Sequence, residues 1–380
     1  MSGWSLLCSA CGECAAGDRL ASVCVECGQP FLVRYDTLPS SRDKLLDRWD
    51  MWRYAAFLPL REGEEPVTLG EGATPLLEVR SLAVELGVRR LWVKDEGLNP
   101  TGSFKARGMS AAVTRGRALS VPGFVVPTAG NAGAALAAYA AAAELPARVY
   151  APESTPQGLL ETIRALGAEL VTVAGSIADA GKAARADAAS SGFFDMSTLR
   201  EPYRIEGKKT LGLELAEQLG WRLPDAIIYP TGGGTGLIGM WKAFGEIRAL
   251  GWLGDATRMP RMISAQAEGC APIARALAAG ADFAIPWENP QTHASGLRVP
   301  GPLGDRLILK ALRESRGDAE VASETEIRAA TRRLAHASGV DASPEGGCAL
   351  AVCRRLIASR RLARDAEVVI FNTGSGAGYR

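Results

Sequence analysis

The fold is decided by the stretch Asn99-Pro-Thr-Gly-Ser-Phe-Lys105-Ala-Arg-Gly108. Asn-Pro and Thr-Gly break regular structure, so they predict a turn between a short strand at residues 91–93 and a helix within residues 102–117. We expect Ser103 to cap this helix, which places Lys105 in its first turn. The field at a helix N-terminus disfavours a positive charge, so Lys105 should be kept partly neutral. A lysine in that state is suited to form a Schiff base.

Outward from this stretch, strands and helices alternate along the chain. Further strands are expected at residues 124–127, 148–150, 169–173, 225–229 and 368–371. Further helices are expected at residues 132–143, 158–166 and 237–250. Alternation of this kind predicts an α/β fold, with parallel sheets covered by helices on both faces. In such folds, ligands bind at the carboxyl ends of the strands.

A second motif, Thr128-Ala-Gly-Asn131-Ala-Gly133, follows the expected strand 124–127 and opens an alanine-rich helix. Small residues let the backbone approach a flat ligand closely. Asn131 could donate a hydrogen bond to a ring oxygen of such a ligand. The alternative is an ordinary strand–helix turn in which Asn131 is a capping residue.

A third motif, Thr231-Gly-Gly-Gly-Thr-Gly236, lies between an apolar strand and a helix. Consecutive glycines expose backbone N–H groups at the helix N-terminus, which is a cradle for phosphate. The run also matches a dinucleotide fingerprint, but no acidic residue follows at a convincing distance. It lacks the Lys-Ser or Lys-Thr of a P-loop, so a P-loop NTPase is excluded.

A fourth motif, Asn372-Thr-Gly-Ser-Gly-Ala-Gly378, follows the last expected strand. Its hydroxyl groups could meet a ring nitrogen, whereas the alternative is a flexible glycine-rich tail. Each motif alone is a weak or moderate indication. The four motifs in this order favour one flat, phosphorylated ligand far more strongly.

The N-terminal segment carries two cysteine pairs, Cys8-x-x-Cys11 and Cys24-x-x-Cys27, separated by twelve residues. A glycine follows each pair and permits the tight turn that points two thiolates at one metal. We therefore predict a structural zinc with four cysteine ligands. The alternative is a set of reduced cysteines without metal.

Composition narrows the class of protein further. Lys plus Arg number 43 and Asp plus Glu number 42, so nothing favours nucleic acid or an anionic membrane as a partner. The longest apolar run is too short to span a bilayer, and the first residues lack a secretory pattern, so we expect a cytoplasmic enzyme. The two histidines, His293 and His336, lie outside any recognisable motif. The chemistry should therefore depend on groups other than imidazole.

These motifs resemble those of the pyridoxal-phosphate enzymes with the tryptophan-synthase-β-like fold, called fold type II. Within them, the chain is most similar to the threonine synthases. The resemblance covers nearly the whole chain and includes the cysteine pairs, Trp52-Arg-Tyr54, Glu71-Gly-Ala-Thr-Pro-Leu, Lys94-Asp-Glu-Gly-Leu-Asn-Pro-Thr-Gly-Ser-Phe-Lys105, Tyr203-Arg-Ile-Glu-Gly-Lys-Lys-Thr210, Gln266-Ala-Glu-Gly269, Ala294-Ser-Gly-Leu-Arg298 and Asn372-Thr-Gly-Ser-Gly376.

The resemblance implies a fold and domain limits. It implies two three-layer α/β/α domains and a small zinc-knuckle-like segment at the N-terminus. We expect the knuckle at 1–35, an arm and the first part of the large domain at 36–105, the small domain at 106–199, and the rest of the large domain at 200–380. Residues 38–60 carry aromatic residues at helical spacing and predict a helical arm or subunit contact. A homodimer is the expected assembly.

The resemblance also implies roles for single residues. Lys105 would hold pyridoxal 5'-phosphate (PLP) and then move protons as a free amine. The other residues expected around the cofactor are Phe104 near the ring, Asn131 at its phenolic oxygen, Thr373 at the pyridine nitrogen, and Gly232, Gly233, Gly234, Thr235 and Gly236 around its phosphate. Ser103, Thr128 and Arg204 are expected to bind substrate, Arg204 through a phosphate group.

Three departures from the family pattern bear on the substrate. Ala106 stands where an aspartate is common, and Ala132 and Gly133 stand where hydroxyl residues are common. The phosphate loop is richer in glycine than in the threonine synthases. The leading hypothesis is conversion of O-phospho-L-homoserine and water to L-threonine and phosphate. The alternatives are a threonine or serine dehydratase or a β-replacement synthase of the same fold and, from a different class, a nucleotide-binding oxidoreductase or a ligand-binding module.

Overall fold

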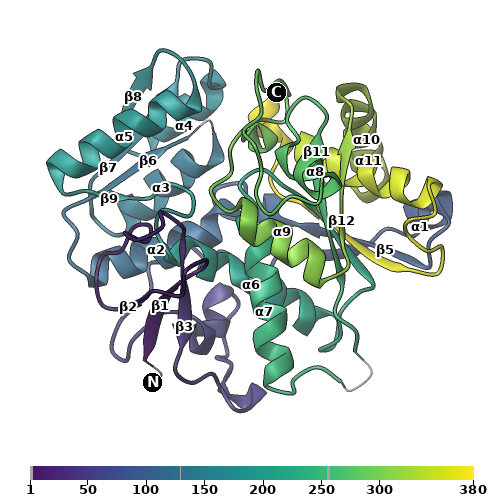
Figure 1. The fold of residues 1–380 in the computed structure, drawn as a ribbon, viewed down its shortest axis with the longest axis horizontal. Coiled ribbons are helices and arrows are strands. Elements are labelled where there is room, and N and C mark those ends of the chain that lie inside the picture. Colours follow the sequence, from purple (N-terminus) through teal and green to yellow (C-terminus); the bar gives the residue numbers. More distant parts are fainter. Residues whose placement is uncertain (1–2, 129, 255–256) are drawn as a thin grey trace. The chain divides into compact units, whose positions relative to one another are not determined.

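The computed structural model describes residues 3–128, 130–254 and 257–380, and the chain divides into two compact units (Figure 1). Unit 1 is formed by Met1–Ala73, Asn99–Thr101 and Lys105–Thr210. Unit 2 is formed by Thr74–Leu98, Gly102–Phe104 and Leu211–Arg380. The chain thus passes repeatedly between the units, and one passage falls between Phe104 and Lys105. The four domain limits expected from the sequence stay predictions.

A six-stranded sheet is the centre of unit 2. Its strands lie in the order β12 (Asp318–Ala322), β11 (Arg261–Ala267), β10 (Ala226–Pro230), β13 (Glu367–Asn372), β5 (Arg90–Asp95) and β4 (Leu76–Glu78). Only the short edge strand β4 runs antiparallel to its neighbour; the described pairs among the other five are parallel. This arrangement confirms the α/β class, because parallel neighbours require crossover connections.

Helices cover both faces of this sheet. The helices are α1 (Arg80–Leu86), α7 (Thr235–Ala249), α8 (Pro272–Ala278), α9 (Asp305–Glu314), α10 (Glu324–Ser338) and α11 (Pro344–Ala358). Ile228 packs in one core cluster with apolar residues of α10 and α11. Since side chains alternate along a strand, its neighbours Ile227 and Tyr229 face the opposite layer. The unit is therefore a three-layer α/β/α structure, as the resemblance implies.

A smaller, all-parallel sheet organises unit 1. Its strands lie in the order β8 (Glu169–Val173), β7 (Ala147–Pro152), β6 (Phe124–Pro127) and β9 (Phe194–Asp195). The helices along it are α2 (Lys105–Ala118), α3 (Asn131–Ala142), α4 (Gln157–Ala165) and α5 (Ile177–Ser191). Phe124 and Val126 share a core with α2 and α3, and Val125 alternates to the other face, where α5 packs.

The N-terminal segment forms a small antiparallel sheet in unit 1. Its strands lie in the order β2 (Cys14–Ala16), β1 (Trp4–Cys8) and β3 (Phe31–Tyr35). Trp4, Leu6 and Val33 are buried in the same core cluster as residues of α2 and α3. The segment therefore packs into unit 1 through an apolar face and shares its core.

The predicted helical arm is wrong in type. Residues 42–57 form two short 3-10 helices, η1 (Arg42–Lys44) and η2 (Met51–Phe57), with a break in helical backbone angles at Tyr54. Trp52 and Phe57 are buried as expected, but Trp49 is 90% exposed. The spacing of the aromatic residues thus reported burial at some positions without reporting an α-helix.

Two helices of unit 1 cross at glycines. They are α2 and the first half of α6 (Tyr203–Gln218). A Cβ atom on Gly207 would lie 1.9 Å from the carbonyl oxygen of Arg107, and one on Gly108 would lie 3.0 Å from the carbonyl oxygen of Arg204. The helices can approach this closely because neither position carries a side chain. This contact sets the α6 side chains against the helix that begins with Lys105.

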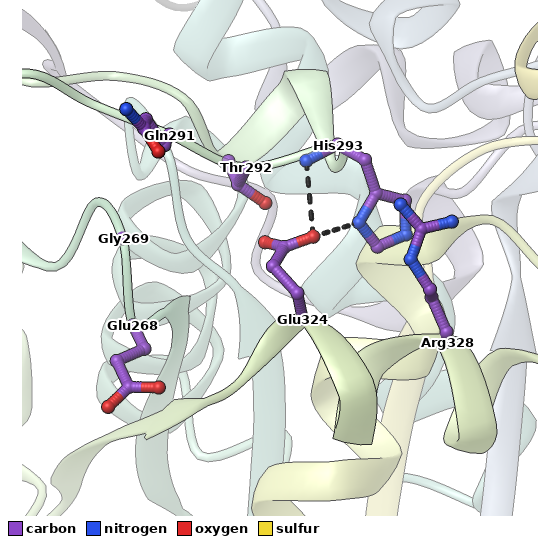
Figure 2. Close-up of a pocket in the computed structure, with 7 residues that line it drawn as sticks. All are labelled: Glu268, Gly269, Gln291, Thr292, His293, Glu324 and Arg328. Atoms are coloured by element: carbon purple, nitrogen blue, oxygen red, sulfur yellow. Dashed lines mark hydrogen bonds and ion pairs between the residues drawn. The ribbon is translucent and has the colours of Figure 1, made fainter.

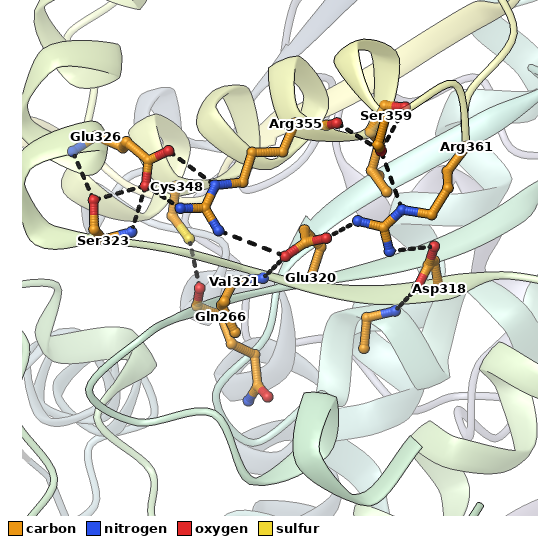
Figure 3. Close-up of polar contacts among 12 residues, drawn as sticks. Gln266, Asp318, Glu320, Val321, Ser323, Glu326, Cys348, Arg355, Ser359 and Arg361 are labelled. Atoms are coloured by element: carbon orange, nitrogen blue, oxygen red, sulfur yellow. Dashed lines mark hydrogen bonds and ion pairs between the residues drawn. The ribbon is translucent and has the colours of Figure 1, made fainter. Parts of the chain in front are cut away.

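A network of ion pairs joins β12, α10 and α11 in unit 2 (Figure 3). Arg355 donates to both carboxylate oxygens of Glu326 at 2.8 and 2.7 Å, and its guanidinium lies 3.7 Å from Glu320. Arg361 contacts Asp318 at 3.2 Å and also pairs with Glu320. Short 3-10 turns complete the unit at η3 (Glu96–Leu98), η4 (Ser295–Leu297) and η5 (Gly376–Tyr379). Across the described ranges, no helix has both the length and the apolar character needed to cross a membrane.

Candidate active site

Within unit 2, the run before Lys105 is bound to the loop that follows β13. The backbone N–H of Phe104 donates to the carbonyl oxygen of Thr373 at 3.1 Å, and Ser103 forms a β-bridge with Gly374. Two motifs that are far apart in the sequence, the first and the fourth, are therefore adjacent. The covalent neighbour of this junction is Lys105, the first residue of α2.

Ser103 does not cap α2 as predicted. Its hydroxyl is fully buried and makes no hydrogen bond within the described part of the chain. A buried hydroxyl group normally has a partner, so one without a partner in the protein is suited to a bound ligand. This is consistent with the prediction that Ser103 contacts a small molecule.

Phe104 connects this junction to the glycine loop of the same unit. Its ring meets Tyr229 edge to face, with the ring centroids 6.0 Å apart and the planes at 87°. A Cβ atom on Gly236 would lie 2.0 Å from the hydroxyl oxygen of Tyr229. Sequence reasoning did not single out Tyr229, although an aromatic residue directly before a glycine loop could have been the signal.

The glycine loop between β10 and α7 has the shape of an anion site. Gly234 is the N-cap of α7 with φ +73°, and no side chain caps the helix there. A Cβ atom on Gly232 would lie 2.2 Å from the carbonyl oxygen of Gly296. The first N–H groups of a helix lack intrahelical partners, so these amides are suited to bind a phosphate group.

Together, these features of unit 2 fit the cofactor predicted from the sequence. The glycine cradle suits a phosphate, Phe104 supplies an apolar ring face, and the hydroxyl of Ser103 has no partner in the described protein. Thr373 is buried at the carboxyl end of β13, as expected of a residue near the ring nitrogen. The positions of these side chains support the predicted roles, which stay predictions.

In unit 1, the turn after β6 is held by Thr128. Its hydroxyl accepts hydrogen bonds from the N–H groups of Gly130 and Gly133 at 3.0 and 3.2 Å. The N-cap of α3 is Gly130, so the interpretation of Asn131 as a capping residue is wrong. A Cβ atom on Gly133 would lie 2.6 Å from Thr128 Cγ2, so this position has no room for a hydroxyl side chain. Asn131 stays the predicted ligand of the cofactor ring.

Arg204 lies in the first turn of α6 and is 2% exposed. Its guanidinium donates to the carbonyl oxygen of Met196 at 2.5 Å and lies 4.0 Å from the carboxylate of Glu201. That carboxylate also accepts from the N–H groups of Tyr203 and Arg204 at 2.7 and 2.9 Å, so it caps the helix. Burial lowers the pKa of Arg204, and Glu201 opposes this effect. Its predicted contact with a substrate phosphate stays a prediction.

The four predicted zinc ligands come together in the N-terminal sheet. The sulfur atoms of Cys8, Cys11, Cys24 and Cys27 all lie within 4.8 Å of one another. Cys8 and Cys27 are 3.4 Å apart, and Cys11 and Cys24 are 3.6 Å apart. Tetrahedral zinc with Zn–S bonds of about 2.3 Å separates its ligand sulfurs by roughly 3.8 Å. The geometry therefore suits the predicted metal.

Unit 2 also has an open hollow of about 460 Å³ away from these motifs (Figure 2). It is lined by Glu268, Gly269, Gln291, Thr292, His293, Glu324 and Arg328. His293 pairs with the carboxylate of Glu324, and Arg328 lies beside them in Figure 2. None of the residues predicted to bind the cofactor or the substrate lines this hollow, so it is a separate feature.

The sequence matches the family model described as pyridoxal-phosphate dependent enzyme over residues 67–374. The chain therefore belongs to the pyridoxal-phosphate dependent enzymes. Among the similar curated proteins is the threonine synthase of Methanosarcina acetivorans, 36% identical over 98% of this chain and 91% of that protein. The threonine synthase of Methanocaldococcus jannaschii is 34% identical over 97% of this chain and 91% of its own length.

Solved structures agree with the fold type. The structure of maize serine racemase matches with a TM-score of 0.70 and 25% identity, covering 80% of this chain and 88% of that chain. A bacterial-type threonine deaminase, from the source abbreviated T.th., matches with a TM-score of 0.65 and 29% identity, covering 80% of this chain and 92% of that chain. The fold type II assignment made from the sequence is confirmed.

Proposed function

We propose that this chain is a threonine synthase that converts O-phospho-L-homoserine and water to L-threonine and phosphate. The observation that carries the proposal is the full-length similarity to threonine synthases, at 36% and 34% identity over at least 97% of the chain. A likeness that spans the knuckle, the arm and both units is more informative than a match of the cofactor motifs alone.

The cofactor would be held by residues from each of the four motifs. Lys105 would bond to it covalently, and the amides of the 232–236 loop would bind its phosphate. Phe104 would lie near the ring, with Asn131 at the ring oxygen and Thr373 at the ring nitrogen. When bound, PLP supplies an electron sink that stabilises negative charge on the substrate carbon next to the amine.

The residues of the chain would then move protons and bind the leaving group. The amine of Lys105, once free, would take the proton from the α-carbon of the substrate. Its place at the start of α2 keeps this amine in a field that disfavours its charge. Arg204 would bind the γ-phosphate, since a guanidinium matches phosphate geometry and stabilises the charge that develops as the bond to carbon breaks.

The direct test is to incubate the cofactor-loaded protein with O-phospho-L-homoserine and to follow phosphate and threonine together. We expect the two products in equal amounts and no turnover by Lys105→Ala. Loss of phosphate without threonine, or no reaction at all in the wild type, would overturn the proposal.

A second candidate is a threonine or serine dehydratase. It is favoured by Ala132 and Gly133 in the turn after β6, by the all-glycine 232–234 loop, and by the 29% identity to a threonine deaminase. This activity would release a keto acid from threonine or serine without phosphate chemistry. Keto-acid release that exceeds turnover of O-phospho-L-homoserine would select this candidate.

We propose a structural zinc for the N-terminal sheet. It is supported by the spacing of the two cysteine pairs and by the approach of their four sulfurs to within 4.8 Å. Four thiolates would complete a tetrahedral sphere and leave no open position for catalysis. The metal would therefore fold the segment and not take part in the reaction.

The homodimer and the cytoplasmic location also stay proposals. In the arm, Trp49 is 90% exposed and Leu46 is 46% exposed. Large apolar side chains exposed together often mark a protein contact. Sedimentation of the wild type beside Trp49→Glu would test whether the arm takes part in an assembly.

A further inference from the structure

Two consecutive lysines of α6, Lys208 and Lys209, are both fully buried, but they have different surroundings. The amine of Lys209 lies 2.8 Å from the carboxylate of Glu206 and 4.3 Å from the ring centre of Tyr35. The hydroxyl of Tyr35 donates to the same carboxylate at 2.7 Å. Lys209 therefore takes part in a local contact between α6 and β3.

Lys208 instead faces the helix that Lys105 opens. A Cβ atom on Gly108 would lie 2.9 Å from the amine nitrogen of Lys208. Gly108 is three residues after Lys105, so the two positions lie on the same face of α2, with Cβ positions about 5–6 Å apart. The missing side chain at 108 gives the amine of Lys208 its place on the face that carries Lys105.

The charges around this amine are unequal. Arg204 and Lys105 oppose the charged form of Lys208, whereas the carboxylate of Glu201 favours it. Burial acts in the same direction as the two cations, and the pKa of Lys208 is held well below its usual range. In this set of four groups, three can be cations and one is an anion. A buried excess of positive charge is costly unless an anion offsets it.

We propose that Lys208 joins Arg204 in binding a tetrahedral oxyanion beside Lys105. The oxyanion is the phosphate group of the substrate or the inorganic phosphate that leaves it. Lys208 would set the preference for phosphorylated over unphosphorylated amino acids. The proposal deepens the function proposed above and rests on it for the identity of the substrate.

The test measures binding of inorganic phosphate to the cofactor-loaded protein by calorimetry, so that the cofactor occupies its own phosphate cradle. Lys208→Gln should weaken phosphate binding by about tenfold or more, because it removes a charge-assisted contact. Binding of L-threonine, which has no phosphate, should change by less than about twofold. The control is Lys182→Gln, at a lysine whose side chain is 74% exposed in α5, and it should bind both ligands as the wild type does.

Steady-state kinetics separate the two sources of the oxyanion. If KM for O-phospho-L-homoserine rises together with the dissociation constant of phosphate, substrate and product share the subsite. If only phosphate binding weakens, the subsite serves the free anion. Phosphate binding in Lys208→Gln equal to that of the wild type overturns the proposal. Lys208→Met, which also removes the charge, replaces it if the glutamine variant does not fold.

The two proposals fail in different ways. A wild type that binds phosphate through Lys208 but does not turn over O-phospho-L-homoserine keeps the subsite and removes the proposed function. A variant that keeps the wild-type KM and phosphate affinity removes the subsite and keeps the function.

Discussion

At the scale of single residues, Gly236 shows how little space the phosphate loop leaves. A Cβ atom there would meet the hydroxyl oxygen and the adjoining ring carbon of Tyr229 at 2.0 and 2.3 Å. Gly236→Ala should therefore displace the loop or the aromatic ring. We expect PLP to bind about tenfold more weakly or worse, a loss of roughly 1.4 kcal/mol, measured by titration of the cofactor-free protein.

The matched control is Gly245→Ala in the same helix, α7. A Cβ atom at this position has no neighbour within 4 Å. Alanine is the better helix former by about 1 kcal/mol, so this variant should bind PLP as the wild type does and be equally or more stable. Equal cofactor affinity in both alanine variants would contradict the role assigned to Gly236.

Glu326 supports a prediction for acid stability. Partial burial acts to raise its pKa, but hydrogen bonds from Arg355 and Ser323 outweigh this and bring the pKa to about 2, below the ordinary 4.5. Because the pKa is depressed by folding, the stabilisation is present above pH 4.5 and is lost as the pH falls toward 2. The pair is partly exposed, so it contributes no more than about 1 kcal/mol.

Chemical unfolding of the wild type and Glu326→Gln at several pH values tests this. The gap in unfolding free energy should be largest near neutral pH and should close between about pH 4.5 and 2. The corresponding change at an exposed site, Glu288→Gln, should show no such gap. A gap for Glu326→Gln that is constant with pH would be inconsistent with the pairing.

At the scale of elements, the crossing of α2 and α6 has the least tolerance. A Cβ atom on Gly207 would lie 1.9 Å from the backbone oxygen of Arg107, which cannot rotate away. Gly207→Ala should destabilise the protein by roughly 1–3 kcal/mol. Urea unfolding measures this, and Gly158→Ala, where nothing lies within 4 Å, should have no such cost.

Local patterns in the sequence predicted some elements well, for physical reasons. The strand 124–127 coincides with β6, and the strand 169–173 coincides with β8. Apolar runs bounded by turn residues define such buried strands locally. The arm was predicted as helical because aromatic spacing reports which side is buried, but it does not distinguish a 3-10 from an α-helix.

The arrangement of the candidate site was less predictable. The four motifs named the cofactor, but the contact of Phe104 with Thr373 depends on strands distant in sequence. The sequence also left Lys208 and Lys209 as alternatives for anion binding. Only the packing of α6 separates them, through Glu206 for one and Gly108 for the other.

At the scale of the whole molecule, the N-terminal sheet gives a test of metal binding. We expect purified protein to hold about one zinc per chain and to lose it in Cys24→Ser. Because structural zinc binding contributes to folding, this loss should lower Tm by at least about 5 °C. Elemental analysis and calorimetry measure the two effects.

Cys14 provides the control for the metal. It is exposed and lies in β2, but it is not one of the four clustered cysteines. Cys14→Ser should keep both the zinc and the Tm of the wild type. A wild-type protein without metal, or equal metal content in both serine variants, would exclude the site.

The repeated passage of the chain between the two units has a consequence for how the protein is made. All of unit 1 has been synthesised once Thr210 leaves the ribosome. In unit 2, β5 pairs with β13, and the bond between Asp95 and Asn372 joins residues 277 positions apart. Strand β5 must therefore wait, unpaired, for nearly the last residues of the chain. Biogenesis of unit 1 can begin during translation, whereas the sheet that carries the glycine loop closes only after translation is almost complete.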